Sequence, residues 1–150
     1  MTMPQAEMLG LQMRFKVTVD GLSLGYWSSC KGISMKFNAK AVHGNVYDSF
    51  NYIPERVEYP DVTVARAMNS KDSPKVWKWL ADCRRQWYGP EPGDWSGKTA
   101  VIQLFDAQYQ LVTSWSLANV YPKEWRGPDL DAGGGGIALE QLVLAHEGFL

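Results

Sequence analysis

The sequence predicts a mainly β fold, an antiparallel β-sandwich or barrel that carries one α-helix. Several short segments alternate apolar and polar residues, a pattern typical of strands with one buried face. A single segment, residues 73–88, spaces its apolar residues as a helix does. Strands joined by hairpin turns, with a helix covering one flank or opening, favour a sandwich or barrel.

The first predicted strands lie in the N-terminal third of the chain. Residues 13–20 alternate strictly, and an Asp-Gly pair then marks a turn. Residues 33–40 alternate as well, and their apolar face consists of Ile33, Met35, Phe37 and Ala39. Their polar face consists of Ser34, Lys36, Asn38 and Lys40. We expect the apolar face to pack on the core of the subunit and the polar face to contact water.

The middle of the chain combines a predicted loop with a predicted strand. Residues 41–56 have no regular period and contain Gly, Asn, Asp and Pro, so they are predicted to form a long loop with a functional role. Residues 57–68 are predicted to form a strand with Val62 and Val64 on one face. Pro60 cannot donate a ladder hydrogen bond, which indicates a bulge or an edge there.

The predicted helix begins at Ser73-Pro74, because Ser favours the N-cap and Pro the first helical position. Val76, Leu80, Cys83 and Trp87 form its apolar stripe, and Gly89-Pro90 ends it.

The C-terminal third is predicted to form a hairpin, a connection and a last strand. The hairpin spans residues 99–106 and 111–120, the Pro- and Gly-rich connection 121–136, and the last strand 137–146. The sequence shows no internal repeat and no domain boundary, so the chain is expected to form a single domain over residues 1–150. A domain of this length buries roughly 68–70% of the surface that its unfolded chain exposes.

Composition narrows the range of functions. The 15 Lys and Arg against 16 Asp and Glu give a net charge of −1, which argues against a polyanion-binding module. The 7 Trp, 7 Tyr and 5 Phe are many for so small a domain, so we expect some of them to face a partner or a ligand. The N-terminus lacks the pattern of a secretion signal and no segment is apolar enough to span a membrane, so we expect the protein to be made in the cytoplasm and to stay soluble there or leave by another route.

The residues that carry chemistry form no recognisable catalytic or metal-binding pattern. Cys30 and Cys83 lack the spacing of a zinc site and are interpreted as reduced structural thiols. His43 and His146 have no nucleophile motif beside them, and the acidic pair before the glycines at 133–136 is too short for an EF-hand. The glycines themselves lack the Lys of a P-loop. The sequence therefore predicts no enzyme, no metal and no cofactor.

The tryptophans leave two functions open. They are interpreted either as a stacking platform for sugar rings, as in a carbohydrate-binding β-sandwich, or as anchors of a large protein interface.

Five parts of the chain, in order, carry a resemblance to a known family. They are RFKVTVDG with LGYWSSCKGI at 14–33, IPERVEY with VTVAR at 53–66, VWKWL at 76–80, ANVYPKEWRGP at 118–128, and IALEQLVLAHEGF at 137–149. Together they resemble the tail tube (inner tube) proteins of contractile phages and of phage-tail-like extracellular contractile injection systems. The resemblance covers the chain from about residue 13 to its end.

The resemblance implies a structural protein without catalytic activity. Such proteins form homohexameric rings in which strands of neighbouring subunits join into a ring barrel. The rings stack helically into a hollow tube, which contraction of a sheath drives through a target envelope. The implied partners are further copies of the chain, the contractile sheath protein, baseplate and spike proteins, and cargo effector or DNA in the lumen, with no membrane anchor. The implied location is a phage tail or a released or cytoplasmic injection particle.

Site residues follow from combining the resemblance with the strand pattern. The expected lumen-lining residues are Ser34, Lys36, Asn38 and Lys40, because a hydrophilic lining lets cargo pass. The expected ring-stacking or subunit-contact residues are His43, Asn45, Tyr47, Phe50, Trp125, Phe149 and Leu150. Residues 1–12 are expected to form an extended arm that reaches the next ring.

Overall fold

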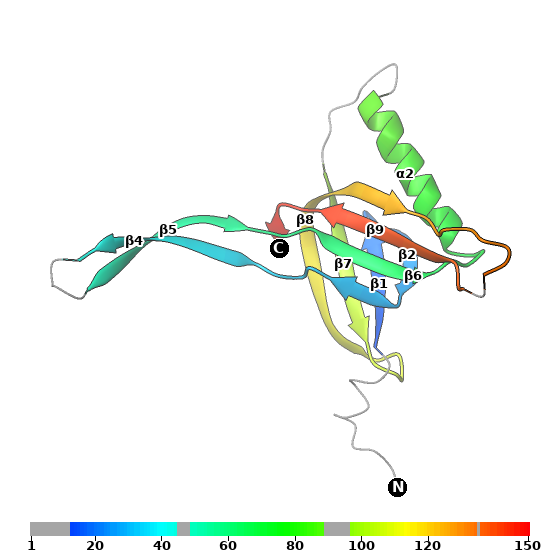
Figure 1. Ribbon diagram of the computed structural model, residues 1–150, viewed down its shortest axis with the longest axis horizontal. Coiled ribbons are helices and arrows are strands. Elements are labelled where there is room, and N and C mark those ends of the chain that lie inside the picture. The colour runs from blue at the N-terminus through cyan, green and yellow to red at the C-terminus, as the bar shows by residue number, and fades with distance from the viewer. Residues whose placement is uncertain (1–12, 45–48, 89–96, 135) are drawn as a thin grey trace, which may run out of the picture.

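A computed structural model describes residues 13–44, 49–88, 97–134 and 136–150 of the protein. These residues form ten strands and a helix, which are β1 (Arg14–Val19), β2 (Leu22–Trp27), β3 (Ser29–Lys31), β4 (Lys36–His43), β5 (Phe50–Glu58), β6 (Val62–Ala67), α2 (Ser73–Tyr88), β7 (Lys98–Phe105), β8 (Leu111–Arg126), β9 (Leu139–Ala145) and β10 (Gly148–Phe149). The predicted class is confirmed, because the fold is mainly β, its sheets are antiparallel and it carries one described helix (Figure 1).

The body of the molecule is one strongly bent sheet in the order β2-β1-β7-β8-β9-β6-β3, with β10 added beside β8. The long strand β8 joins its two halves: residues up to Val120 pair with β7, and Tyr121–Arg126 pair with β9. Asn119 takes a positive φ of 50° just before the partner changes. Asparagine tolerates this left-handed conformation better than most residues, which suits it to the bend.

The two end strands of the sheet, β2 and β3, are consecutive in the chain and meet at Ser28. Both the amide and the hydroxyl of Ser28 donate to the carbonyl of Ala65, at 3.0 and 2.9 Å. Gly32, just beyond β3, has a φ of 94°, and a Cβ there would lie 2.0 Å from the carbonyl oxygen of Asp61. The sheet therefore curls until its ends meet, as in a barrel. Only glycine fits at position 32, where the chain passes close to the backbone of Asp61.

The core lies inside this curled sheet and under α2. The alternation predicted for the first strand is confirmed by the buried Val17 and Val19, and the placement of Val62 and Val64 on one face is confirmed because both are buried. The other buried members of the core cluster are Leu24, Trp27, Val76, Trp79, Cys83, Ala100, Ile102, Leu117, Val120, Leu142 and Leu144.

The helix forms over the predicted residues, but its start differs in detail. The carbonyl of Asp72 accepts from the amides of Lys75 and Val76, so Asp72 holds the cap position and Ser73 lies in the first turn. The hydroxyl of Ser73 instead donates to Glu140 and accepts from the amide of Asn69. A buried carboxylate needs donors, and Ser73 supplies one.

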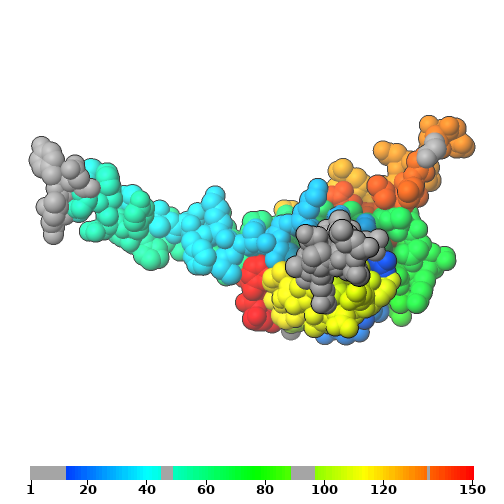
Figure 2. Space-filling view, turned by 90° about the horizontal axis from the view of Figure 1, so that it is seen from below, coloured from blue at the N-terminus to red at the C-terminus, as the bar shows by residue number. Residues whose placement is uncertain are grey.

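Three segments differ from the predicted boundaries. Residues 41–56 are for the most part not a loop, since β4 and β5 form a hairpin that projects far from the body (Figures 1 and 2). The predicted connection 121–136 begins with six residues of β8, because β9 supplies their backbone partners. The predicted strand 57–68 is divided, with Pro60 between β5 and β6. In the first two cases strand pairing outweighed local turn propensity, whereas in the third the strand is interrupted at Pro60.

Candidate assembly surfaces

The projecting β4–β5 hairpin exposes an apolar face. Alternate residues of β4, among them Phe37, Ala41 and His43, share one face. Tyr52 and Phe50 lie opposite Ala41 and His43 on the same face. Phe37 is 74% exposed and Tyr52 is 71% exposed. The face is therefore available for contact with another chain.

The prediction that Ile33, Met35, Phe37 and Ala39 pack on the core of the subunit is wrong beyond its first residue. Ile33 packs against the core cluster, whereas Met35, Phe37 and Ala39 are exposed. The alternation itself is real, but this stretch leaves the body in a two-stranded ribbon. Among the residues that the structure describes, no second layer of the same subunit covers the ribbon.

The four residues predicted to line the lumen lie on and just before β4. Lys36, Asn38 and Lys40 share the face opposite Phe37, and the side-chain amide of Asn38 donates to the carbonyl of Arg56 at 3.1 Å. Ser34 precedes the strand, is exposed, and donates to the carbonyl of Gly32 at 3.4 Å. Three of the four thus share one face of the hairpin, which is mostly polar but also carries Ile53, opposite Lys40 and 52% exposed, and their lining of a channel stays a prediction.

The residues predicted to make ring or subunit contacts fall in separate places. His43 and Phe50 lie together near the far end of the hairpin, with ring centroids 5.3 Å apart. Phe149 packs on the core cluster, whereas Leu150 is 79% exposed. Asn45, Tyr47 and the N-terminal arm 1–12 lie outside the described residues.

Trp125, another of these residues, makes several contacts inside the subunit. Its indole N–H donates to Glu140 at 3.3 Å, and its ring lies 4.7 Å from that of Trp77 on α2. The side chain is half-buried. Its role in subunit contact stays a prediction.

Sequence reasoning missed a buried ionic network in the body. Arg66 and Glu140 face each other across β6 and β9, with Nε and Oε2 3.2 Å apart and both side chains at most 4% exposed. The signal was in the alternation: Arg66 shares the phase of Val62 and Val64, and Glu140 shares that of Leu142. A charged residue in a buried phase indicates a paired partner.

The network joins five elements of the fold, namely β6, β9, β2, α2 and β8. Nη1 of Arg66 donates to the carbonyls of Leu24 and Tyr26 at 2.6 and 3.2 Å, and its guanidinium lies 3.8 Å from the centre of the Trp27 ring. Glu140 accepts from Ser73 on α2 and from Trp125 on β8. Arg66 and Glu140 therefore hold the end strand β2, the helix and the second half of β8 in one arrangement.

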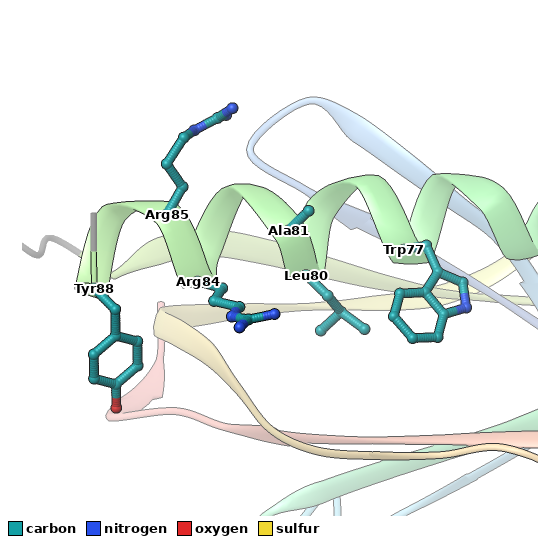
Figure 3. Close-up of a pocket in the computed structure, with 6 residues that line it drawn as sticks. All are labelled: Trp77, Leu80, Ala81, Arg84, Arg85 and Tyr88. Carbon is teal, nitrogen blue, oxygen red and sulfur yellow. The ribbon is translucent and has the colours of Figure 1, made fainter. Parts of the chain in front are cut away.

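The outer side of α2 carries a groove of about 450 Å³, lined by Trp77, Leu80, Ala81, Arg84, Arg85 and Tyr88. Figure 3 shows Trp77, Leu80, Arg84 and Tyr88 pointing to one side of the helix, with Arg85 pointing away from them. Trp77 is 53% exposed and Tyr88 is 81% exposed. The groove is thus an apolar surface with cationic margins.

The remaining candidates for chemistry do not assemble into a site. His43 is exposed on the hairpin, while His146 is buried beside Tyr59 and Phe149. Burial raises the pKa of the Cys30 and Cys83 thiols to about 11, so both are protonated at neutral pH. Among the described residues, no three potential metal ligands gather in one place, and no helix has the length and apolar character needed to cross a membrane.

Comparisons with known proteins agree on the fold. The chain is similar to a chain in the baseplate of the anti-feeding prophage, with 18% identity, a TM-score of 0.68, and coverage of 100% of this chain and 96% of that one. It is also similar to a chain of the sheath–tube complex of an extracellular contractile injection system, PVC, in its extended state, with 14% identity, a TM-score of 0.70, and coverage of 99% and 97%. A type six secretion system protein is more distant, with 10% identity, a TM-score of 0.52, and coverage of 89% and 79%.

The sequence comparison identifies the family. The model of the T4-like virus tail tube protein gp19 family matches residues 11–150. The chain therefore belongs to this tail tube protein family, which confirms the resemblance drawn from its motifs. No curated protein matches the chain.

Proposed function

We propose that this protein is the structural subunit of the inner tube of a contractile tail or injection system. The observation that carries the proposal is the match of the tail tube family model over residues 11–150. The role is mechanical and requires no catalytic group. Its subunits form hexameric rings, the rings stack into a hollow conduit, and contraction of the surrounding sheath drives that conduit through a target envelope.

The hairpin supports ring formation. An isolated two-stranded ribbon is marginally stable, and its outer edges leave backbone groups unpaired. Its apolar face, with Phe37 and Tyr52 exposed, is also left uncovered by the described part of the chain. Neighbouring subunits that join these strands into a ring barrel supply both the edge partners and the cover.

The polar face of the same hairpin is proposed to line the lumen. Lys36, Asn38 and Lys40 on β4, with Ser34 just before it, present hydrophilic groups. Cargo effector or DNA passes such a surface without adhering to an apolar wall.

Contacts between rings and between subunits are proposed at three places, which are the far end of the hairpin, Trp125 on β8, and the C-terminus. His43 and Phe50, with the neighbouring Asn45 and Tyr47, are proposed to contact the next ring or the neighbouring subunit, as are Trp125, Phe149 and Leu150. The arm 1–12 is proposed to reach across rings as part of a single domain over residues 1–150. The further partners are the sheath, baseplate and spike proteins, and assembly takes place in the bacterial cytoplasm.

The carbohydrate-binding alternative has no observation in its favour. A platform for sugar rings needs several exposed aromatic faces side by side. Of the six tryptophans in the part of the chain that the structure describes, Trp77 alone is exposed. The others are buried or half-buried within the subunit.

Negative-stain imaging of the purified protein tests the proposal. We expect rings with a central hole, and stacks of rings when the protein is expressed with its baseplate, which nucleates growth. A variant lacking residues 1–12 is expected to remain soluble and form rings that stack poorly. A protein that stays monomeric in the presence of the baseplate, and whose tryptophan fluorescence responds to saccharides, would contradict the tube function.

A further inference from the structure

The exposed apolar residues of the described chain include two groups that fit one another. One is the groove on α2, and the other is the segment Asp129–Asp131 in the connection that follows β8. We propose that Asp129-Leu130-Asp131 of one subunit docks into the α2 groove of a second copy of the chain. The inference rests on the proposed function and names a contact within the assembled tube.

The groove combines apolar area with positive charge. Trp77, Leu80 and Tyr88 supply its apolar lining. Arg84 makes no ion pair with any described residue, whereas Arg85 pairs with Asp82. The helix carries Lys75, Lys78, Arg84 and Arg85 against a single carboxylate, Asp82, although the whole chain has a net charge of −1. An apolar side chain flanked by carboxylates suits such a surface.

The segment after β8 has that chemistry. Leu130 is 86% exposed, the highest exposure among the large hydrophobic residues of the described chain, and it stands between two aspartates. Asp131 accepts from the amide of Gly133 at 3.0 Å, and its carbonyl accepts from Gly134 at 3.1 Å, which shapes a turn. In Figure 2 this connection protrudes from the end of the molecule opposite the hairpin. An exposed leucine directly before an ordered turn is held in a defined position, which lowers the entropy cost of docking it.

The two surfaces are different, so each copy offers one groove and one anchor. Leu130 is exposed, so it is not seated in the groove of its own chain. A head-to-tail contact of this kind propagates from copy to copy and closes into a ring or continues along a stack, as repeated assembly requires. Because the groove is positively charged and the anchor is negatively charged, two grooves repel each other, and a groove binds an anchor instead of a second groove.

Charge reversal with rescue tests the contact. Arg84→Glu is expected to reduce assembled particles about tenfold at equal protein concentration, because it sets like charges against each other across the contact. Asp129→Arg is expected to do the same, and the double variant R84E/D129R is expected to recover to within about threefold of the wild type. The matched control is Lys78→Glu, which makes the same charge change on α2 outside the groove and is expected to assemble normally. Circular dichroism confirms that each variant folds.

The outcomes separate this inference from the proposed function. Recovery in the double variant, together with loss of assembly on Leu130→Ser, supports the contact. If the wild type forms tubes and R84E and L130S do so equally well, the contact is overturned while the tube function stands, and the groove then serves a partner other than this chain. If both single variants fail and the double variant does not recover, the pairing is also overturned. A wild type that never forms rings refutes the proposed function itself.

Discussion

The body of this subunit and its projecting hairpin are built from the same kind of strand, yet they treat their apolar residues differently. In β6 and β9 of the body the apolar phase is buried, and even the charged residues in that phase, Arg66 and Glu140, are paired and almost inaccessible. In β4 of the hairpin the apolar phase is exposed, with Phe37 at 74%.

This difference indicates that the body determines the stability of the subunit, and we expect the hairpin to determine its assembly. The body has the enclosed core that makes a domain stable alone, whereas no described residue of the same chain covers the apolar face of the hairpin, which other subunits bury under the proposed function. Substitutions in the body should therefore alter the free energy of unfolding. Substitutions in the hairpin should alter assembly and leave that free energy nearly unchanged.

The largest expected effect comes from breaking the ionic network. Glu140→Ala leaves the Arg66 guanidinium buried without its carboxylate, and we expect it to lower the free energy of unfolding by about 3–5 kcal/mol. Chemical denaturation measures this value. The control is Glu124→Ala, which removes an exposed ion pair with Arg126 and should change stability by less than about 0.5 kcal/mol. Equal effects of the two substitutions would show that the network does not stabilise the body.

A cavity in the core should cost somewhat less. Leu142 on β9 is fully buried, and Leu142→Ala is expected to destabilise the subunit by about 2–5 kcal/mol. Leu139→Ala, on the same strand at a position 55% exposed, is the matched control and should stay within about 0.5 kcal/mol of the wild type. Thermal or denaturant unfolding of both variants gives the comparison, and a small effect at Leu142 would show that the body is loosely packed.

The hairpin should respond in the opposite way. Tyr52→Ser is expected to change the stability of the isolated subunit by less than about 0.5 kcal/mol, because the side chain is 71% exposed. It should nevertheless reduce ring formation, measured by negative-stain imaging and light scattering. Lys40→Ser, on the polar face, is the control and should assemble. Destabilisation by Tyr52→Ser as large as that by Leu142→Ala would mean that the hairpin packs on its own body in solution.

The expected effect that is smallest near neutral pH is a loss of stability that begins only under alkaline conditions. Burial raises the pKa of Cys30 and of Cys83 from 9.0 to about 11, so the folded state holds these protons more tightly than the unfolded state. The resulting stabilisation is complete below pH 9 and is lost as the pH rises through about 11. Unfolding measured from pH 8 to 11 should decline more in the wild type than in a variant with both cysteines changed to alanine. Parallel pH profiles would contradict the expectation.

Much of the body could be predicted because its signals are local. The alternation at residues 13–20 and the phase of Val62 and Val64 reflect the two faces that a strand must have. The apolar spacing at residues 73–88 predicted the helix, because a helix that packs on a core has one apolar face. The local sequence at 41–56 predicts a loop, because it contains Gly, Asn and Pro. The hairpin forms there because pairing between β4 and β5 outweighs these local preferences.

The candidate surfaces were only partly predictable. Lys36, Asn38 and Lys40 do share a polar face, as their spacing predicted, but the segment Asp129–Asp131 and the α2 groove came from exposure in the folded chain. Trp77 illustrates why: its helical spacing suits a buried stripe, yet it is 53% exposed.

By itself the sequence determined the β class, the single described helix, most strand phases and, through its ordered motifs, the tail tube family. The tertiary structure alone decided which apolar faces are buried within the subunit, how β8 passes from one half of the sheet to the other, and that Arg66 meets Glu140. The physical reason is that periodicity separates the two faces of a strand, whereas burial depends on which distant element covers each face.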